Sequence, residues 1–268
     1  MNEFTLEKNE RSIWVREWKV DKPTAYIFIS HGLGEHGGRY NELALHFNGL
    51  GYTVVAHDHF GHGKSSGKYG HVEHFNVYSD DLNTVVNHYS TDLPKYLLGH
   101  SLGAVIASGY ETRYPGTIKK LILTSPGFEK KVPPNAIKAG LGKLLANIAP
   151  KLTLWNEIKP EMVCRTPEII NAYSTDKLVH DRVSAKFFTS FLNEIDYLKT
   201  HIPKINIPLL MLISGSDLII DHTVSKTYYD LFSSSEKKWV EYPEAYHEVL
   251  NEENEKTLAF KEIEEWLT

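Results

Sequence analysis

A short strand, a serine-bearing turn and a helix follow one another within residues 95–110, and this succession constrains the fold most strongly. The turn spans Gly99–Gly103 and reads G-H-S-L-G, a G-x-S-x-G sequence. Apolar residues before the turn predict the strand, and those after it predict the helix. The flanking glycines make room for a strained backbone that holds a serine hydroxyl clear of a sheet. The context predicts a nucleophile elbow with Ser101 as the nucleophile.

Segments that read as strands alternate with segments that read as helices along most of the 268 residues. Residues 1–20 read as a hairpin of two edge strands. Further strands are expected at 26–29, 52–56, 95–98, 121–124, 208–213 and 238–242, and helices at 40–50, 77–89, 104–110, 223–232 and 252–267. Continuous apolar strands that alternate with helices are typical of a mostly parallel sheet covered on both faces. We therefore expect a single α/β domain over residues 1–268 with an eight-stranded sheet.

Residues 126–190 interrupt this alternation. The stretch is rich in proline and shows no clear strand, and apolar residues recur at helical spacing between positions 137 and 148. We interpret it as a helical insertion between two strands of the sheet. Long insertions in compact domains are usually functional, so a cap over the active site is favoured over extra core packing.

Composition excludes several classes of protein. The net charge of −5 argues against a nucleic-acid partner, because phosphate binding requires clustered Lys and Arg. Cys164 is the only cysteine, so no intrachain disulfide forms, and a small buried side chain is the expected role. The first residues lack a secretory signal, and no apolar run reaches the ~18 residues that a membrane span needs. We expect a cytoplasmic protein, with a peripheral location at a membrane as the alternative.

The partners of a serine nucleophile are found after later strands. A serine hydroxyl needs a base to take its proton and an acid to orient the base, and in this architecture the chain order is Ser, Asp or Glu, His. Asp217 follows the strand that ends near residue 213, and His247 follows the last strand. We predict a catalytic triad of Ser101, Asp217 and His247. Asp221, four residues further on, is the competing candidate for the acid.

The oxyanion hole requires two backbone N–H groups directed at the developing negative charge. The residue after the nucleophile, Leu102, supplies one of them. The second is expected from the loop after the strand at residues 26–29, where the sequence reads His31-Gly32-Leu33-Gly34. Leu33 is therefore the second candidate donor. His31 is expected to shape this loop.

The sequence also contains signals of two other kinds of site. Gly32–Gly37 matches G-x-G-x-x-G after a strand, with Asp58 about 20 residues further on, as in dinucleotide-binding proteins. That interpretation is disfavoured because the residues after Gly34 start a helix poorly and the triad candidates would have no role. The histidines at 57, 59 and 62 suggest metal ligation, but they stand beside a glycine-rich loop and are expected to bond to backbone groups. We predict no metal and no cofactor.

Taken together, the motifs resemble those of the monoacylglycerol lipase and lysophospholipase branch of the α/β-hydrolases. The resemblance covers nearly the whole chain and rests on four segments: 31–40, 56–65, 99–103 and 244–247. It implies the α/β-hydrolase fold with Ser101, Asp217 and His247 as the triad. The insertion also resembles that family's cap, and by position Tyr173 resembles a cap tyrosine that approaches the glycerol head group. Leu102, Ala104 and residues 214–216 differ from the residues usual in the family.

The resemblance implies a serine carboxylester hydrolase that acts on a small lipid ester. Monoacylglycerol is the leading substrate, lysophospholipid is the second, and a carboxylesterase of broader specificity is the third. A hydrolase-fold binding protein without turnover is the alternative from a different class, and the complete set of triad candidates disfavours it. Transient contact of the cap with a membrane surface is possible under this hypothesis. The sequence leaves acyl-chain length and oligomeric state open.

Overall fold

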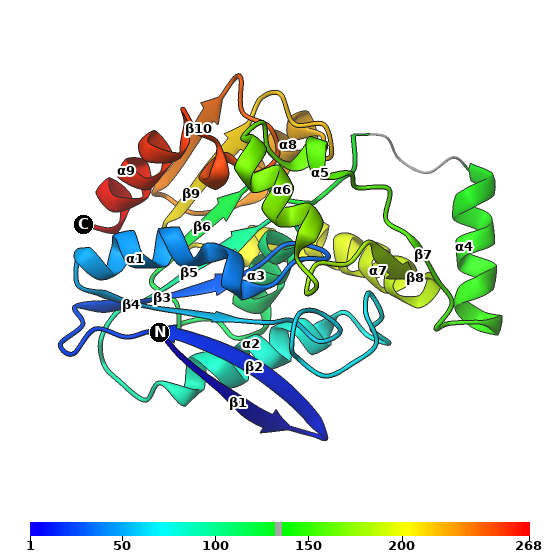
Figure 1. Ribbon diagram of the computed structural model, residues 1–268, viewed down its shortest axis with the longest axis horizontal. Helices are drawn as coiled ribbons and strands as arrows, with labels where there is room; N and C mark the ends of the chain where they lie inside the picture. Colours follow the sequence, from blue (N-terminus) through cyan, green and yellow to red (C-terminus); the bar gives the residue numbers. More distant parts are fainter. Residues whose placement is uncertain (132–135) are drawn as a thin grey trace.

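The computed structural model describes residues 1–131 and 136–268 (Figure 1). The main sheet contains β1 (Asn2–Lys8), β2 (Arg11–Trp18), β3 (Ala25–Ser30), β4 (Tyr52–His57), β5 (Lys95–His100), β6 (Lys120–Thr124), β9 (Leu209–Ser214) and β10 (Lys237–Tyr242). The helices are η1 (Gly37–Tyr40), α1 (Asn41–Gly49), α2 (Asn76–His88), α3 (Leu102–Arg113), α4 (Ala136–Ile148), α5 (Pro160–Val163), α6 (Pro167–Thr175), α7 (Ala185–His201), η2 (Ile202–Lys204), α8 (His222–Leu231), η3 (Val249–Asn251) and α9 (Lys256–Leu267).

The eight strands lie in the order β1-β2-β4-β3-β5-β6-β9-β10. β2 runs antiparallel to both of its neighbours, while β4, β3, β5, β6, β9 and β10 pair in parallel. This order confirms the expected α/β-hydrolase fold, with a mostly parallel sheet that begins with an edge hairpin. In such a sheet the loops that follow the parallel strands gather along one edge, where ligands bind.

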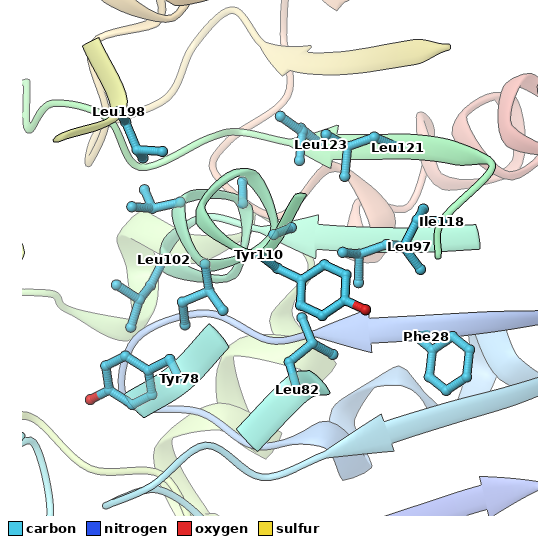
Figure 2. Packing of buried hydrophobic residues seen from close by; sticks show 14 of the residues in the cluster. Phe28, Tyr78, Leu82, Leu97, Leu102, Tyr110, Ile118, Leu121, Leu123 and Leu198 are labelled. Carbon is cyan, nitrogen blue, oxygen red and sulfur yellow. The ribbon is translucent and has the colours of Figure 1, made fainter. Parts of the chain in front are cut away.

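Apolar side chains cover both faces of the sheet, because neighbouring strand residues point to opposite sides. On one face, Phe28, Leu97, Leu121 and Leu123 pack against helices α2, α3 and α7 (Figure 2). On the other face, alternate residues of the same strands pack against α1 and α9. Helix α3 is buried on all sides over its first ten residues, so its position relative to β5 is tightly fixed.

The segment between β6 and β9 differs in part from the expected insertion. Its helices agree with the helical interpretation, but two short strands, β7 (Thr153–Trp155) and β8 (Arg182–Ser184), form a small antiparallel sheet. The expectation of no strand there was wrong, because three residues are too few to show a strand-like alternation in sequence. Helix α7 also continues through residue 190 without a break, so no element ends at that position.

Helix α4 stands apart from the main sheet at one end of the molecule and packs against α7 (Figure 1). The segments after it are held close to the sheet. The Ser184 N–H donates to the Gly70 carbonyl at 2.7 Å, and the His180 N–H donates to the Gly34 carbonyl at 2.8 Å. Within residues 1–131 and 136–268, none of the helices combines the length and the apolar character needed to cross a bilayer.

Candidate active site

Ser101 lies at the sharp turn between β5 and α3, with φ 52° and ψ −115°. This backbone conformation is rare for a residue with a side chain and is strained. A Cβ atom at Gly99 or Gly103 would collide with backbone atoms, in the second case those of Ser30. The Ser101 N–H donates to the Thr124 carbonyl on β6 at 3.0 Å. The two glycines and the neighbouring strand therefore hold the turn that the G-x-S-x-G sequence predicts.

His247 and Asp217 meet at the same edge of the sheet. Asp217 follows β9 and His247 follows β10, and the Asp217 Oδ2 lies 2.7 Å from the His247 Nδ1. The other carboxylate oxygen accepts the N–H groups of Ile219 and Ile220 at 2.7 and 2.9 Å. Both side chains are buried, so the carboxylate is oriented by three hydrogen bonds that bulk water does not disturb.

Opposing effects set the protonation of this pair. Burial favours the neutral carboxyl, but the charge and hydrogen bond of His247 and the two backbone N–H groups outweigh it and lower the pKa of Asp217. Burial likewise favours a neutral imidazole, but the charge and hydrogen bond of Asp217 raise the pKa of His247 above its ordinary value. The pair therefore combines an ionised carboxylate with an imidazole of increased basicity.

Asp221, the competing candidate, has a different position. Its Oδ1 accepts the N–H of Thr223 at 3.0 Å and the hydroxyl of the same residue at 2.6 Å, which makes it the N-cap of α8. The structure thus places Asp217 beside His247 and places Asp221 at a helix start.

The loop after β3 presents Leu33 beside the elbow, and its backbone is held by side chains. The His31 Nδ1 lies 2.8 Å from the Gly32 carbonyl oxygen, while its Nε2 accepts the His59 N–H at 3.0 Å. These contacts assign the neutral tautomer with the proton on Nδ1. Burial lowers the pKa of His31 well below its ordinary value, which agrees with this assignment. Because the Gly32 carbonyl is fixed, so is the peptide plane that carries the Leu33 N–H.

One cavity is lined by four of the predicted residues. Its lining includes Leu33, Ser101, Tyr173 and His247, with Ile158, Val163 and Ile219 as further apolar contributors. Leu102 buries its side chain in the core, so only its backbone at the start of α3 faces the elbow. The first N–H groups of a helix have no partner within the helix, and such groups suit an anion.

The Arg39 guanidinium lies over the Tyr173 ring, 4.8 Å from its centroid.

The histidines considered as metal ligands bond to one another and to the backbone. The His57 Nε2 lies 3.2 Å from the His59 Nδ1, and the His59 Nε2 lies 3.0 Å from the His31 carbonyl oxygen. Burial lowers the pKa of His57 to about 4 and that of His62 to about 3. These neutral rings support the loop after β3. In the part of the chain that the structure describes, no three His, Cys, Asp or Glu side chains are arranged to hold a metal ion.

Asp58, the acidic residue of the dinucleotide-binding pattern, is buried and already bonded. Its Oδ1 accepts from the Arg16 guanidinium at 2.5 Å and from the Gly37 N–H at 2.9 Å, and its Oδ2 accepts the Lys64 N–H at 2.8 Å. The residues after Gly34 form the 3₁₀ turn η1, and α1 begins only at Asn41. The geometry does not favour a dinucleotide site, because neither a free carboxylate nor a helix start is present in this segment.

Three charged residues beside the site were missed by sequence reasoning. Glu35, Arg39 and Glu248 form a buried ion-pair network that adjoins both the Leu33 loop and His247. Glu35 and Arg39 lie in segment 31–40, which carries part of the family resemblance, and Glu248 directly follows His247, but neither position indicates an ion pair between them. Charged side chains are rarely buried, so a local sequence pattern gives little reason to expect such a network.

The fold and this arrangement of serine, histidine and aspartate define a serine hydrolase of the α/β-hydrolase class. The family model described as "Serine aminopeptidase, S33" matches residues 21–254. A monoglyceride lipase homolog of monkeypox virus is 35% identical, over 95% of this chain and 94% of its own length. The chain belongs to the monoacylglycerol lipase family of α/β-hydrolases.

Two further comparisons extend this result. The crystal structure of Paleococcus ferrophilus monoacylglycerol lipase superimposes with a TM-score of 0.88 and 29% identity, covering 95% of this chain and 98% of that one. A phospholipase of Bacillus subtilis is 32% identical over 88% of this chain and 92% of its own length. The relatives therefore share the whole domain and carry names that refer to different lipid substrates.

Proposed function

We propose that this enzyme hydrolyses monoacylglycerol to a fatty acid and glycerol through an acyl-enzyme. The 2.7 Å contact between Asp217 and His247, at the cavity that Ser101 also lines, is the observation that carries the proposal. Membership in the monoacylglycerol lipase family supports the choice of substrate.

In the proposed mechanism, the His247 Nε2 takes the proton from the Ser101 hydroxyl as its oxygen attacks the ester carbonyl. The N–H groups of Leu33 and Leu102 stabilise the resulting oxyanion, and Asp217 stabilises the imidazolium. His247 then gives the proton to the departing glycerol oxygen, which leaves Ser101 acylated. Water, deprotonated by His247, attacks the acyl-enzyme and releases the fatty acid. No cofactor takes part in these steps.

We assign the segment of about residues 126–190 as a cap on a single domain that spans residues 1–268. The assignment is supported by Ile158, Val163 and Tyr173, which come from this segment and line the cavity beside Ser101. Tyr173 is proposed to contact the substrate, since it lines the cavity and the Arg39 guanidinium lies over its ring.

Fatty-acid release from 1-monoacylglycerols of several chain lengths, measured beside lysophosphatidylcholine, tests the substrate. We expect faster release from monoacylglycerol, and no release from either lipid by Ser101→Ala. Faster release from lysophosphatidylcholine would keep the mechanism and replace the substrate, an outcome for which the similarity to the Bacillus phospholipase gives a reason. No release from either lipid, together with no labelling by a fluorophosphonate, would contradict the proposal and favour a binding protein.

We also propose that the cap touches a membrane surface while the substrate enters. Exposed apolar side chains support this: Ile148 at the end of α4 and Trp155 on β7 are each 69% exposed, and Leu144, Leu152 and Leu154 are also exposed. Apolar side chains concentrated near one end of a domain favour insertion into the interface of a bilayer. The cytoplasmic location remains a prediction from the sequence.

Sedimentation with phosphatidylcholine vesicles tests the membrane contact. The double variant Ile148→Ser/Trp155→Ser is expected to bind at least about tenfold more weakly than the wild type, since two apolar side chains no longer leave water. Leu258→Ser, on α9 away from the cap and 60% exposed, is the matched control and is expected to bind as the wild type does. Equal binding by all three proteins would contradict the contact.

A further inference from the structure

The Arg39 guanidinium joins two carboxylates that come from distant parts of the chain. Its Nη1 lies 2.6 Å from the Glu35 Oε2, and its two terminal nitrogens hold both oxygens of Glu248 at 2.6 and 2.7 Å. The Glu35 and Glu248 side chains are buried, and the Arg39 side chain is 11% exposed. The Tyr40 hydroxyl donates to Glu35 at 2.9 Å, and the Asn251 side-chain amide donates to Glu248 at 2.8 Å, so each carboxylate has a further neutral donor.

Each carboxylate belongs to a loop that carries part of the proposed catalytic machinery. The Glu35 Oε1 accepts the Gly32 N–H at 2.5 Å, one residue before the proposed oxyanion donor Leu33. Glu248 directly follows the proposed base His247. Arg39 therefore lies on a continuous chain of hydrogen bonds that connects the oxyanion loop to the loop of the general base.

Stability alone does not account for this network. The free energy needed to remove two charged groups from water is about as large as the free energy gained from their attraction. A buried ion pair therefore often stabilises a fold no more than an apolar replacement does. A guanidinium bound to a carboxylate through two parallel hydrogen bonds does, however, fix distance and orientation. We propose that Arg39 is a positioning residue that, through Glu35 and Glu248, sets the spacing between the oxyanion loop and the loop of His247. This inference rests on the proposed serine hydrolase mechanism.

The spacing matters because acyl transfer uses both loops at the same time. His247 must reach the Ser101 oxygen while the Leu33 N–H points at the carbonyl oxygen of the same ester. A displacement of about 1 Å in such an arrangement can lower the rate by about 10²-fold. Loss of the bridge is therefore expected to lower kcat by about 10- to 100-fold and to leave KM within about threefold, since Arg39 would act on the geometry of the reaction rather than on binding.

The experiment measures kcat and KM for a soluble short-chain ester, p-nitrophenyl butyrate, with Arg39→Met, Arg39→Lys and Glu248→Gln. Arg39→Lys is expected to restore part of kcat, because an ammonium keeps the charge but cannot bind two oxygens in parallel. Arg113→Met is the matched control. Arg113 holds Glu194 through the same two-bond arrangement at 2.7 Å, between α3 and α7, and its loss is expected to reduce stability while kcat stays unchanged.

The pH profile distinguishes positioning from general destabilisation. His247 must be neutral to act as a base, so a higher pKa moves the acid limb of kcat/KM to higher pH. Glu248 and Glu35 add to the effect of Asp217 in raising the pKa of His247. Burial and the neighbouring neutral His100 do not favour protonation of the His247 ring. Glu248→Gln removes a negative charge near His247 and should move the acid limb of kcat/KM to lower pH, whereas Arg113→Met should leave it in place.

Lower kcat in Arg39→Met and Glu248→Gln, with the acid limb of Glu248→Gln moved to lower pH, supports the inference. If Arg39→Met does not fold, Glu248→Gln and Arg39→Lys provide the same comparison with smaller changes in buried charge. Folded Arg39→Met and Glu248→Gln proteins with the kcat of Arg113→Met would overturn the inference. A wild-type protein that neither hydrolyses the ester nor reacts with a fluorophosphonate would overturn the proposed mechanism instead, so the two failures are distinguishable.

Discussion

Replacing Ser101 with Ala is expected to lower ester turnover by about a million-fold and to abolish labelling by a fluorophosphonate. Without the hydroxyl, His247 has no proton to take and no acyl-enzyme forms. The fold should persist, because the strained turn is held by Gly99, by Gly103 and by the bond from the Ser101 N–H to β6, none of which involves the side chain. Steady-state hydrolysis, labelling and thermal unfolding measure the three effects.

Ser101→Gly is the companion variant that tests the elbow itself. At φ 52° and ψ −115° a side chain costs of order 1–3 kcal/mol, which glycine avoids, although glycine loses about 0.5–1 kcal/mol through the greater freedom of the unfolded chain. Ser101→Gly is therefore expected to unfold at a higher temperature than Ser101→Ala, with both proteins inactive. Appreciable hydrolysis by pure, folded Ser101→Ala would remove Ser101 from the mechanism.

The catalytic candidates were visible in the sequence because the topology is simple. In a parallel sheet, residues that directly follow different strands reach the same edge, so Ser101 after β5, Asp217 after β9 and His247 after β10 were expected to meet. The structure lines one cavity with Ser101 and His247 and joins His247 to Asp217. The G-x-S-x-G sequence, the apolar runs and the chain order of the three candidates together predicted this arrangement.

Contacts between distant segments were not predictable in this way. Arg39 and Glu248 are far apart in the sequence, and nothing in either local pattern marks a buried ion pair. Helix α9 was expected to begin at Glu252 but begins at Lys256. The Glu252 carboxylate is buried, where it accepts the Tyr246 N–H at 2.7 Å and pairs with Arg165 on the segment before α6, so a tertiary contact holds it outside the helix.

The His31 contact shows what the sequence did not indicate about the loop that carries Leu33. The sequence indicated which peptide carries the Leu33 N–H, yet the orientation of that peptide depends on the ring of His31 and, through it, on the His59 backbone. A neutral ring is required, since His31 must donate through Nδ1 and accept through Nε2 at the same time. Burial lowers its pKa and keeps it in that form.

Asp217→Asn is expected to lower kcat/KM by about 10⁴-fold, whereas Asp221→Asn should leave it nearly unchanged. Asp221 caps α8, and asparagine caps a helix about as well as aspartate does. Kinetics of the two purified variants, with thermal unfolding as the check on folding, make the comparison. A larger loss in Asp221→Asn would mean that the acid had been assigned to the wrong residue.

The size of the Asp217→Asn effect follows from the bonds around the carboxylate. Its Oδ1 accepts two backbone N–H groups, from Ile219 and Ile220, so an asparagine must keep its carbonyl oxygen there and turn its amide towards His247. The amide then donates to the His247 Nδ1, which moves the ring proton to Nε2, where a proton prevents the nitrogen from accepting one from Ser101. Asp217→Ala leaves the tautomer free, so Asp217→Asn should be at least as inactive as Asp217→Ala although it conserves the shape of the side chain. A markedly more active Asp217→Asn would show that the tautomer does not control the reaction.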